Sequence, residues 1–109
     1  MPHCLIEHSE TIDGEFLMPL VFEGASESGL FEVNTIQVRT LSFNHYTIEN
    51  KKTDFIHVVL KILTGRTPEQ KNHLSGLVMN KLKANFITRC TITVEVVDID
   101  GSSYSKSII

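Results

Sequence analysis

The sequence contains no tryptophan, and aromatic residues make up only 7% of its 109 residues. A platform of rings for stacking nucleic-acid bases is therefore not expected. It has no block of lysine and arginine and a formal net charge of -3, which also argues against a nucleic-acid surface. No apolar run approaches the roughly 20 residues that cross a membrane. No basic segment followed by an apolar one marks a secretory signal, so we expect a cytoplasmic protein.

Cysteine is also scarce. Cys4 and Cys90 lie far apart in strand-like segments and have no metal-ligand spacing. We expect both to be reduced, mostly buried thiols rather than a disulfide or a nucleophile. The histidines show no metal spacing either, so no metal ion is expected. The length predicts one domain, residues 1–109.

Four segments are rich in apolar and β-branched residues with a period of two, which predicts four strands. They are His3–His8, Ile36–Phe43, Phe55–Leu63 and Thr91–Val97. In the third segment one face is continuously apolar and is assigned to the core; it carries Ile56, Val58, Leu60 and Ile62. The opposite face of that strand mixes apolar and polar residues, and such a face meets either solvent or another subunit.

Two segments have helical spacing. The first is weakly specified and is expected to begin near Met18, because Pro19 suits the first turn of a helix, and to stop at Gly29. The second has a strong start at Thr67-Pro68, and Gln70 completes a capping box. An apolar stripe continues this second helix for three further turns.

The predicted order is β-α-β twice, over residues 1–45 and 54–100, followed by a tail at 101–109. Each unit is long enough for a crossover between parallel strands. The expected fold is α/β (α+β by some schemes), a four-stranded sheet with both helices on one face. The second face of the sheet stays uncovered, and burying it requires a partner, so a homo-oligomer is expected.

Three residues point to one chemical site. If Met1 is removed, Pro2 becomes an ordered secondary amine at the start of a strand, a candidate general base. Arg39 and Arg66 would lower the pKa of such an amine and bind carboxylates. Each residue taken alone more often has an ordinary role. Pro2 would be an edge-strand proline, Arg39 would form a surface ion pair, and Arg66 would be a solvated turn residue.

The segments MPHCLIEHS and FIHVVLKILTGRT, together with Gly29-Leu30-Phe31, resemble the 5-carboxymethyl-2-hydroxymuconate isomerase family of the tautomerase superfamily. The resemblance implies a tautomerase-like trimer without metal or organic cofactor, in which Pro2 moves a proton within a small unsaturated keto-enol acid. It implies that Arg39 acts with Pro2 and that Arg66 binds substrate carboxylates. Gln37 stands where the family usually has a further arginine, so Gln37 is expected to hydrogen-bond the substrate instead.

Two alternatives remain open at this point. The same proline could serve another tautomerase-superfamily reaction on a small unsaturated acid, such as decarboxylation or hydrolytic dehalogenation. The chain could also be a non-catalytic oligomeric binding protein with the same fold, a possibility favoured by Gln37.

Overall fold

The computed structural model describes residues 1–86 and 88–109. In chain order its elements are β1 (His3–Ser9), α1 (Gly14–Glu27), a 3-10 turn (Val33–Thr35), β2 (Gln37–Phe43), β3 (Asp54–Leu63), α2 (Pro68–Lys83) and β4 (Cys90–Ile99). The sheet order is β2-β1-β3-β4. The outer pairs β1–β2 and β3–β4 are parallel, and the central pair β1–β3 is antiparallel.

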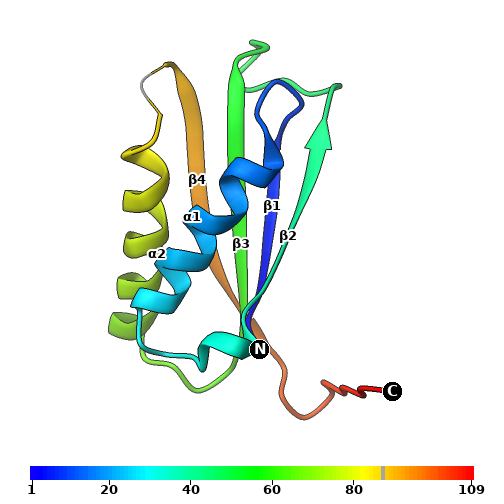
Figure 1. The fold of residues 1–109 in the computed structure, drawn as a ribbon, viewed down its shortest axis with the longest axis vertical. Coiled ribbons are helices and arrows are strands. Elements are labelled where there is room, and N and C mark those ends of the chain that lie inside the picture. The colour runs from blue at the N-terminus through cyan, green and yellow to red at the C-terminus, as the bar shows by residue number, and fades with distance from the viewer. Residues whose placement is uncertain (87) are drawn as a thin grey trace.

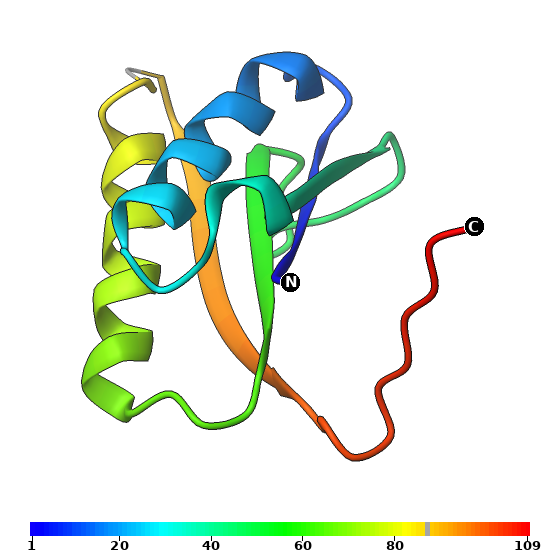
Figure 2. The same ribbon diagram turned by 60° about the horizontal axis from the view of Figure 1, so that its bottom comes forward.

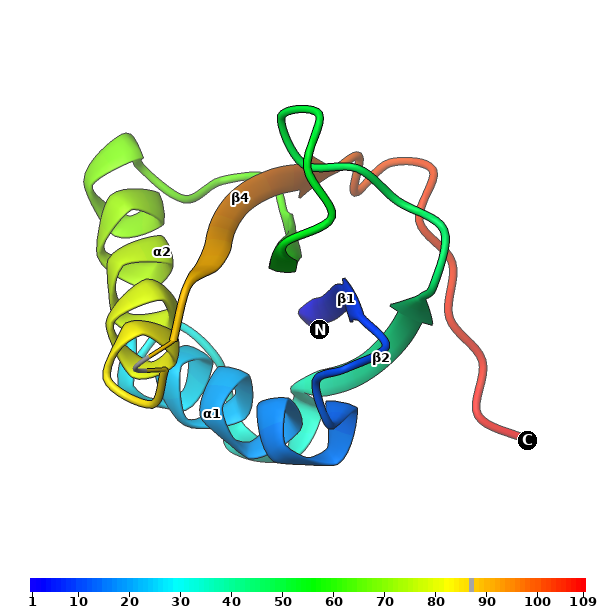
Figure 3. The same cartoon turned by 90° about the horizontal axis from the view of Figure 1, so that it is seen from above.

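Both helices cover the same face of the sheet, as Figures 1 and 3 show. The core lies between the helices and that face. β3 provides the four side chains that its apolar alternation assigned to the core, each at most 1% exposed. The predicted fold class, a four-stranded sheet with two helices on one face, is therefore confirmed.

Helix α1 begins earlier than the sequence predicted. It starts at Gly14, after Asp13, whose side chain accepts a hydrogen bond from the Glu15 amide. Pro19 therefore lies inside the helix, where its ring nitrogen cannot donate the usual bond to the preceding turn. Pro19 is on the exposed side of α1, so the carbonyl that loses this bond is not forced into the core. The stop is confirmed: Gly29 follows the helix with a φ of 73°, a conformation that glycine adopts without strain.

Helix α2 begins as predicted, with a full capping box between Thr67 and Gln70 and Pro68 in the first turn. It packs closely on α1 because Gly24 has no side chain. A Cβ atom at Gly24 would lie 2.8 Å from the Cα of Val78. This glycine therefore sets how near the two helices approach.

The other side of the sheet, which we call the open face, carries no helix. Strand register aligns its side chains in rows across the sheet, and the row at the N-terminal end of β1 contains Gln37, His3, Lys61 and Val97. At the opposite end the open face is partly covered, because Tyr46 packs on Phe55 with ring centroids 4.9 Å apart.

The start of β1 and the end of β4 lie at the same end of the sheet. The Thr64 amide donates to the Ile99 carbonyl there at 3.2 Å. Figures 1 and 2 show the N-terminus beside this end and the C-terminal tail leaving from it. Among the described residues, no helix is both long and apolar enough to cross a membrane.

Candidate active site

The chain terminus is anchored at the end of the sheet where β1 begins. Pro2 is almost completely buried, and its carbonyl accepts a hydrogen bond from the Gln37 amide at 3.0 Å. Met1 precedes it, and the Met1 amine donates to the Thr35 carbonyl at 2.8 Å. Consecutive residues are about 3.8 Å apart, so an amine on Pro2 would sit close to the position of the Met1 amine.

Burial lowers the pKa of the Met1 amine below its usual value of 8.0, and the charge of Lys106 acts in the same direction. The Cys4 thiol opposes both effects weakly, as the smallest cause. The surroundings of the chain terminus therefore shift its amine towards the neutral form. A neutral amine is the form that a general base requires.

His3 lies at the centre of a hydrogen-bonded series on the open face. Its Nδ1 is 3.3 Å from Nη1 of Arg39, and its Nε2 is 3.0 Å from the Tyr104 hydroxyl. Arginine has no acceptor, so Arg39 donates and Nδ1 of His3 carries no proton. The imidazole is then neutral with its proton on Nε2, which donates to the Tyr104 oxygen.

The surroundings of His3 are cationic. Burial lowers the pKa of His3, followed by the charge of Arg39. The terminal ammonium, Lys61 and Lys106 lower it further. Positive groups on β2, β3, the terminus and the tail thus meet around one side chain. Such a cluster suits an anionic ligand, a carboxylate in particular.

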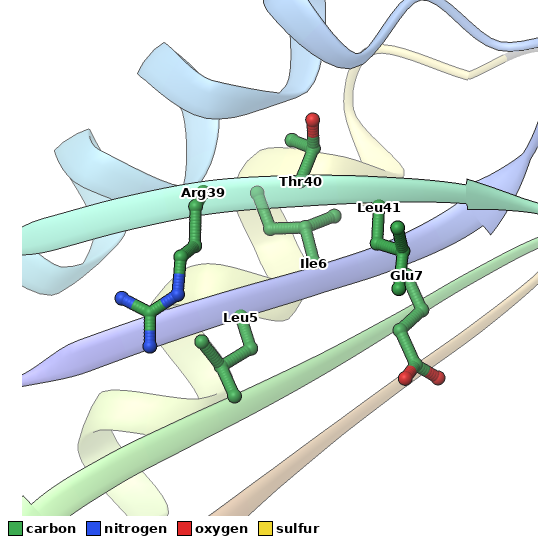
Figure 4. Close-up of a pocket in the computed structure, with 6 residues that line it drawn as sticks. All are labelled: Leu5, Ile6, Glu7, Arg39, Thr40 and Leu41. Atoms are coloured by element: carbon green, nitrogen blue, oxygen red, sulfur yellow. The ribbon is translucent and has the colours of Figure 1, made fainter.

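Arg39 also borders a cavity of about 340 Å³ between β1 and β2. Figure 4 shows the Arg39, Leu5 and Glu7 side chains on one side of the two strands and Thr40 on the other. The period of two in the second strand puts Gln37 and Arg39 on one face, in agreement with the strand register. Pro2 does not line this cavity. It lies at the end of the sheet where β1 begins, next to His3.

Arg66 lies at the same end of the molecule but contacts other residues. Its Nη2 donates to the Leu30 carbonyl at 2.8 Å, and its guanidinium lies 5.6 Å from the centroid of the Phe31 ring. Arg66 therefore ties the segment after α1 to the turn before α2. The Met1 amine contacts the same segment between α1 and β2 at a later residue, Thr35.

The other candidates from the sequence are not part of this cluster. Both cysteines are free, and burial raises the pKa of Cys4 to about 11, so this thiol is not an activated nucleophile. His57 lies on the open face between Thr93 and Glu95, with ring nitrogens 2.6 Å and 2.7 Å from their side-chain oxygens. Within residues 1–86 and 88–109, no group of three histidine, cysteine or acidic side chains is placed to hold a metal ion.

Sequence reasoning treated His3 as an ordinary histidine and gave Tyr104 and Lys106 no role. The alternation of β1 does put His3 on the open face beside Arg39, so its position could have been found. Tyr104 is 101 residues from His3 and gives no local signal.

Comparison with known proteins agrees with the fold. A search by sequence against curated proteins finds no match. Among solved structures, a 5-carboxymethyl-2-hydroxymuconate delta-isomerase superposes with a TM-score of 0.81 at 15% identity, covering 99% of this chain and 88% of that one. A 5-carboxymethyl-2-hydroxymuconate isomerase from Deinococcus radiodurans R1 gives 0.72 at 18% identity, covering 97% and 88%. A fused 4-OT wild-type symmetric trimer gives 0.75 at 10% identity, covering 96% and 91%.

At these identities the structures show the fold. The family follows from a sequence model, that of 5-carboxymethyl-2-hydroxymuconate isomerase, which matches residues 2–107. This match covers nearly the whole chain and includes Pro2, Arg39 and Arg66. The protein therefore belongs to the 5-carboxymethyl-2-hydroxymuconate isomerase family and is an isomerase.

Proposed function

We propose that this isomerase interconverts the enol and keto forms of a 2-hydroxymuconate-like unsaturated carboxylic acid, with the Pro2 amine as general acid-base after removal of Met1. The observation that carries the proposal is the setting of the chain terminus. The terminal amine is anchored, and its pKa is lowered by burial and by Lys106. A secondary amine on Pro2 would share this setting, in which burial and positive charge lower its pKa towards the neutral form that accepts a proton.

The reaction needs only a proton and a shift of double bonds. The neutral Pro2 amine removes the proton from the 2-hydroxyl group of the dienol, leaving a dienolate. The resulting ammonium then returns the proton to a carbon of the conjugated chain. One O–H bond breaks, one C–H bond forms, and the 2-oxygen becomes a carbonyl. No metal or organic cofactor enters this sequence.

Arg39 and Gln37 would bind the substrate from the open face. Arg39 is exposed and carries a guanidinium that can hold a carboxylate through two parallel hydrogen bonds. Gln37 is two positions from Arg39 on the same face and offers a neutral donor. Arg66 has one described hydrogen bond, to Leu30, out of the five N–H donors of a guanidinium. We assign its remaining donors to a second substrate carboxylate.

A homo-oligomer, and specifically a trimer, is part of this proposal. The open face exposes Leu41 to 60% and leaves Val59 only partly covered, whereas the helix-side residues of β3, Ile56 to Ile62, are buried. A sheet face that mixes apolar and polar residues is suited to another copy of the chain. The similar fold of a symmetric trimer supports this arrangement. We treat residues 1–109 as one tautomerase-like unit within that assembly, in the cytoplasm.

A second candidate is a non-catalytic binding protein with the same fold. One observation favours it: Gln37 supplies no charge. With Met1 retained, the Pro2 nitrogen is an amide and has no basicity. The cationic cluster around His3 would then bind an acid without isomerising it.

Intact-mass analysis followed by turnover separates the two candidates. The proposal expects a mass without Met1 and ketonisation of 2-hydroxymuconate, followed by ultraviolet absorbance. Pro2→Ala should lose about 100-fold or more in kcat, the usual contribution of a general acid-base. A mass that includes Met1, or full turnover by Pro2→Ala, would exclude the proline mechanism.

A further inference from the structure

The tail after β4 is folded back by a compact turn. The Asp100 carboxylate accepts from the Ser102 amide at 3.2 Å and from the Ser102 hydroxyl at 2.8 Å. The Tyr104 amide donates to the Asp100 carbonyl at 3.1 Å. This turn directs the Tyr104 side chain towards the start of β1. Tyr104 is partly buried, whereas the other residues of the tail are exposed.

Tyr104 meets His3 in a defined geometry. The hydroxyl is 3.0 Å from Nε2, and the two rings pack edge to face with centroids 6.1 Å apart and planes at 62°. Because Arg39 occupies Nδ1, the histidine donates from Nε2 and the tyrosine oxygen accepts. The phenolic proton is consequently free to point away from His3 and donate to a ligand.

The hydrogen-bonded series Arg39–His3–Tyr104 begins at the positive charge of Arg39 and ends at the phenolic proton of Tyr104. Each hydrogen bond in such a series polarises the next one, so the last donor is stronger than an isolated phenol. The hydroxyl also lies beside the cationic cluster, where an anionic substrate would bind. Lys106, two residues further along the tail, is near enough to lower the pKa of both His3 and the Met1 amine.

We propose that Tyr104 donates a hydrogen bond to the 2-oxygen of the dienolate, with His3 and Arg39 as the residues that position it. The inference rests on the proposed function, because it needs a substrate whose 2-oxygen gains negative charge. No proton leaves Tyr104; the proton exchanged in the reaction stays with Pro2. A donor aimed at an oxygen that becomes charged is stronger in the transition state than in the ground state, so it raises kcat more than it lowers KM.

The test uses Tyr104→Phe, which keeps the ring that packs on His3 and removes only the hydroxyl. The matched control is Tyr46→Phe, the same change at the far end of the sheet, where Tyr46 packs on Phe55. With 2-hydroxymuconate as substrate, Tyr104→Phe should lower kcat by about 100-fold with KM changed less than about threefold. Tyr46→Phe should retain the wild-type kcat.

The positioning role of His3 is tested separately. His3→Phe should reproduce the loss in kcat, and His3→Gln should recover part of it, because an amide side chain both accepts from Arg39 and donates to Tyr104. A purely structural role for His3 would show equal losses in both variants. That result would overturn the positioning role.

The possible outcomes separate the role of Tyr104 from the proposed function on which it rests. If the wild type turns over 2-hydroxymuconate with dependence on Pro2 and Tyr104→Phe keeps the full kcat, the role of Tyr104 is wrong and the proline mechanism stands. If Tyr104→Phe raises KM alone, the residue binds substrate without stabilising the dienolate, and the inference is overturned. If the wild type shows no turnover, both are wrong.

Discussion

Arg39 donates to Nδ1 of His3 across 3.3 Å, and this contact requires a neutral imidazole. Burial and then the charge of Arg39 lower the pKa of His3 below its usual value of 6.5. The contact is made only by the deprotonated ring, so acidification must break it.

Stability should therefore decrease on the acid side of pH 6.5. Above that value His3 is neutral in both the folded and unfolded chains, and its contribution is fully present. As the pH falls through 6.5 towards the lowered folded pKa, the unfolded chain takes up the proton first and is stabilised relative to the folded one. Urea unfolding at about pH 7.5 and pH 5 should show a larger loss for the wild type than for His3→Gln. An identical loss in the two proteins would contradict the proposed state of His3.

Two of the helical glycines, Gly24 and Gly76, should respond in opposite directions to alanine. In Gly24→Ala the new Cβ would lie 2.8 Å from the Cα of Val78, so the helices must separate. Such overpacking costs about 1–3 kcal/mol of unfolding free energy. In Gly76→Ala the new Cβ meets nothing within 4 Å, and the gain in helix propensity is about 1 kcal/mol. Denaturant unfolding measures both, and stabilisation in both variants would mean that α1 and α2 are not in close contact.

Restoring a charge at Gln37 should change substrate preference. Gln37 and Arg39 project from the same face of β2, two positions apart in the sequence. Gln37→Arg would offer a second guanidinium to a dicarboxylate, and an exposed charged hydrogen bond of this kind is worth roughly tenfold in binding. We expect KM for a dicarboxylate substrate to fall about tenfold, with little change for a monocarboxylate. Equal effects on both substrates would place Gln37 outside the carboxylate site.

Assembly should depend on the open face. A charge at Val59, in the middle of that face, would be buried without a partner between subunits, a severe penalty. Val59→Asp should therefore shift the mass measured by light scattering from trimer to monomer. Val33→Asp makes the same change at a valine that is 52% exposed in the 3-10 turn before β2, and this variant should remain a trimer. A monomeric wild type would contradict the proposed use of the open face.

The sheet and the second helix could be predicted from the sequence because their signals are local. The alternation from Ile56 to Ile62 gave the buried face of β3, and Thr67 with Gln70 gave the start of α2. The start of α1 was wrong by four residues, because Pro19 favours a first turn but is tolerated further inside on an exposed side. Local propensity was overridden there by the Asp13 cap and by the packing of the helix on the sheet.

The site was only partly predictable. Arg39 and Gln37 followed from strand alternation, but the meeting of His3 with Tyr104 joins the two ends of the chain. That contact depends on the antiparallel pairing of β1 with β3, which has no distinct pattern in the sequence, and on the path of the tail after the turn at Asp100. Arg66 had a turn signal, yet its contact with Leu30 required the path of the segment after α1.

The central claim is that the free amine of Pro2 carries the reaction. The most direct measurement compares kcat for ketonisation of 2-hydroxymuconate between the processed protein and a chain with one glutamate inserted after Met1, which blocks processing and leaves Pro2 intact as an amide. We predict that the inserted chain loses about 100-fold or more in kcat, because an amide nitrogen cannot accept the proton. Equal kcat in the two chains would contradict the account.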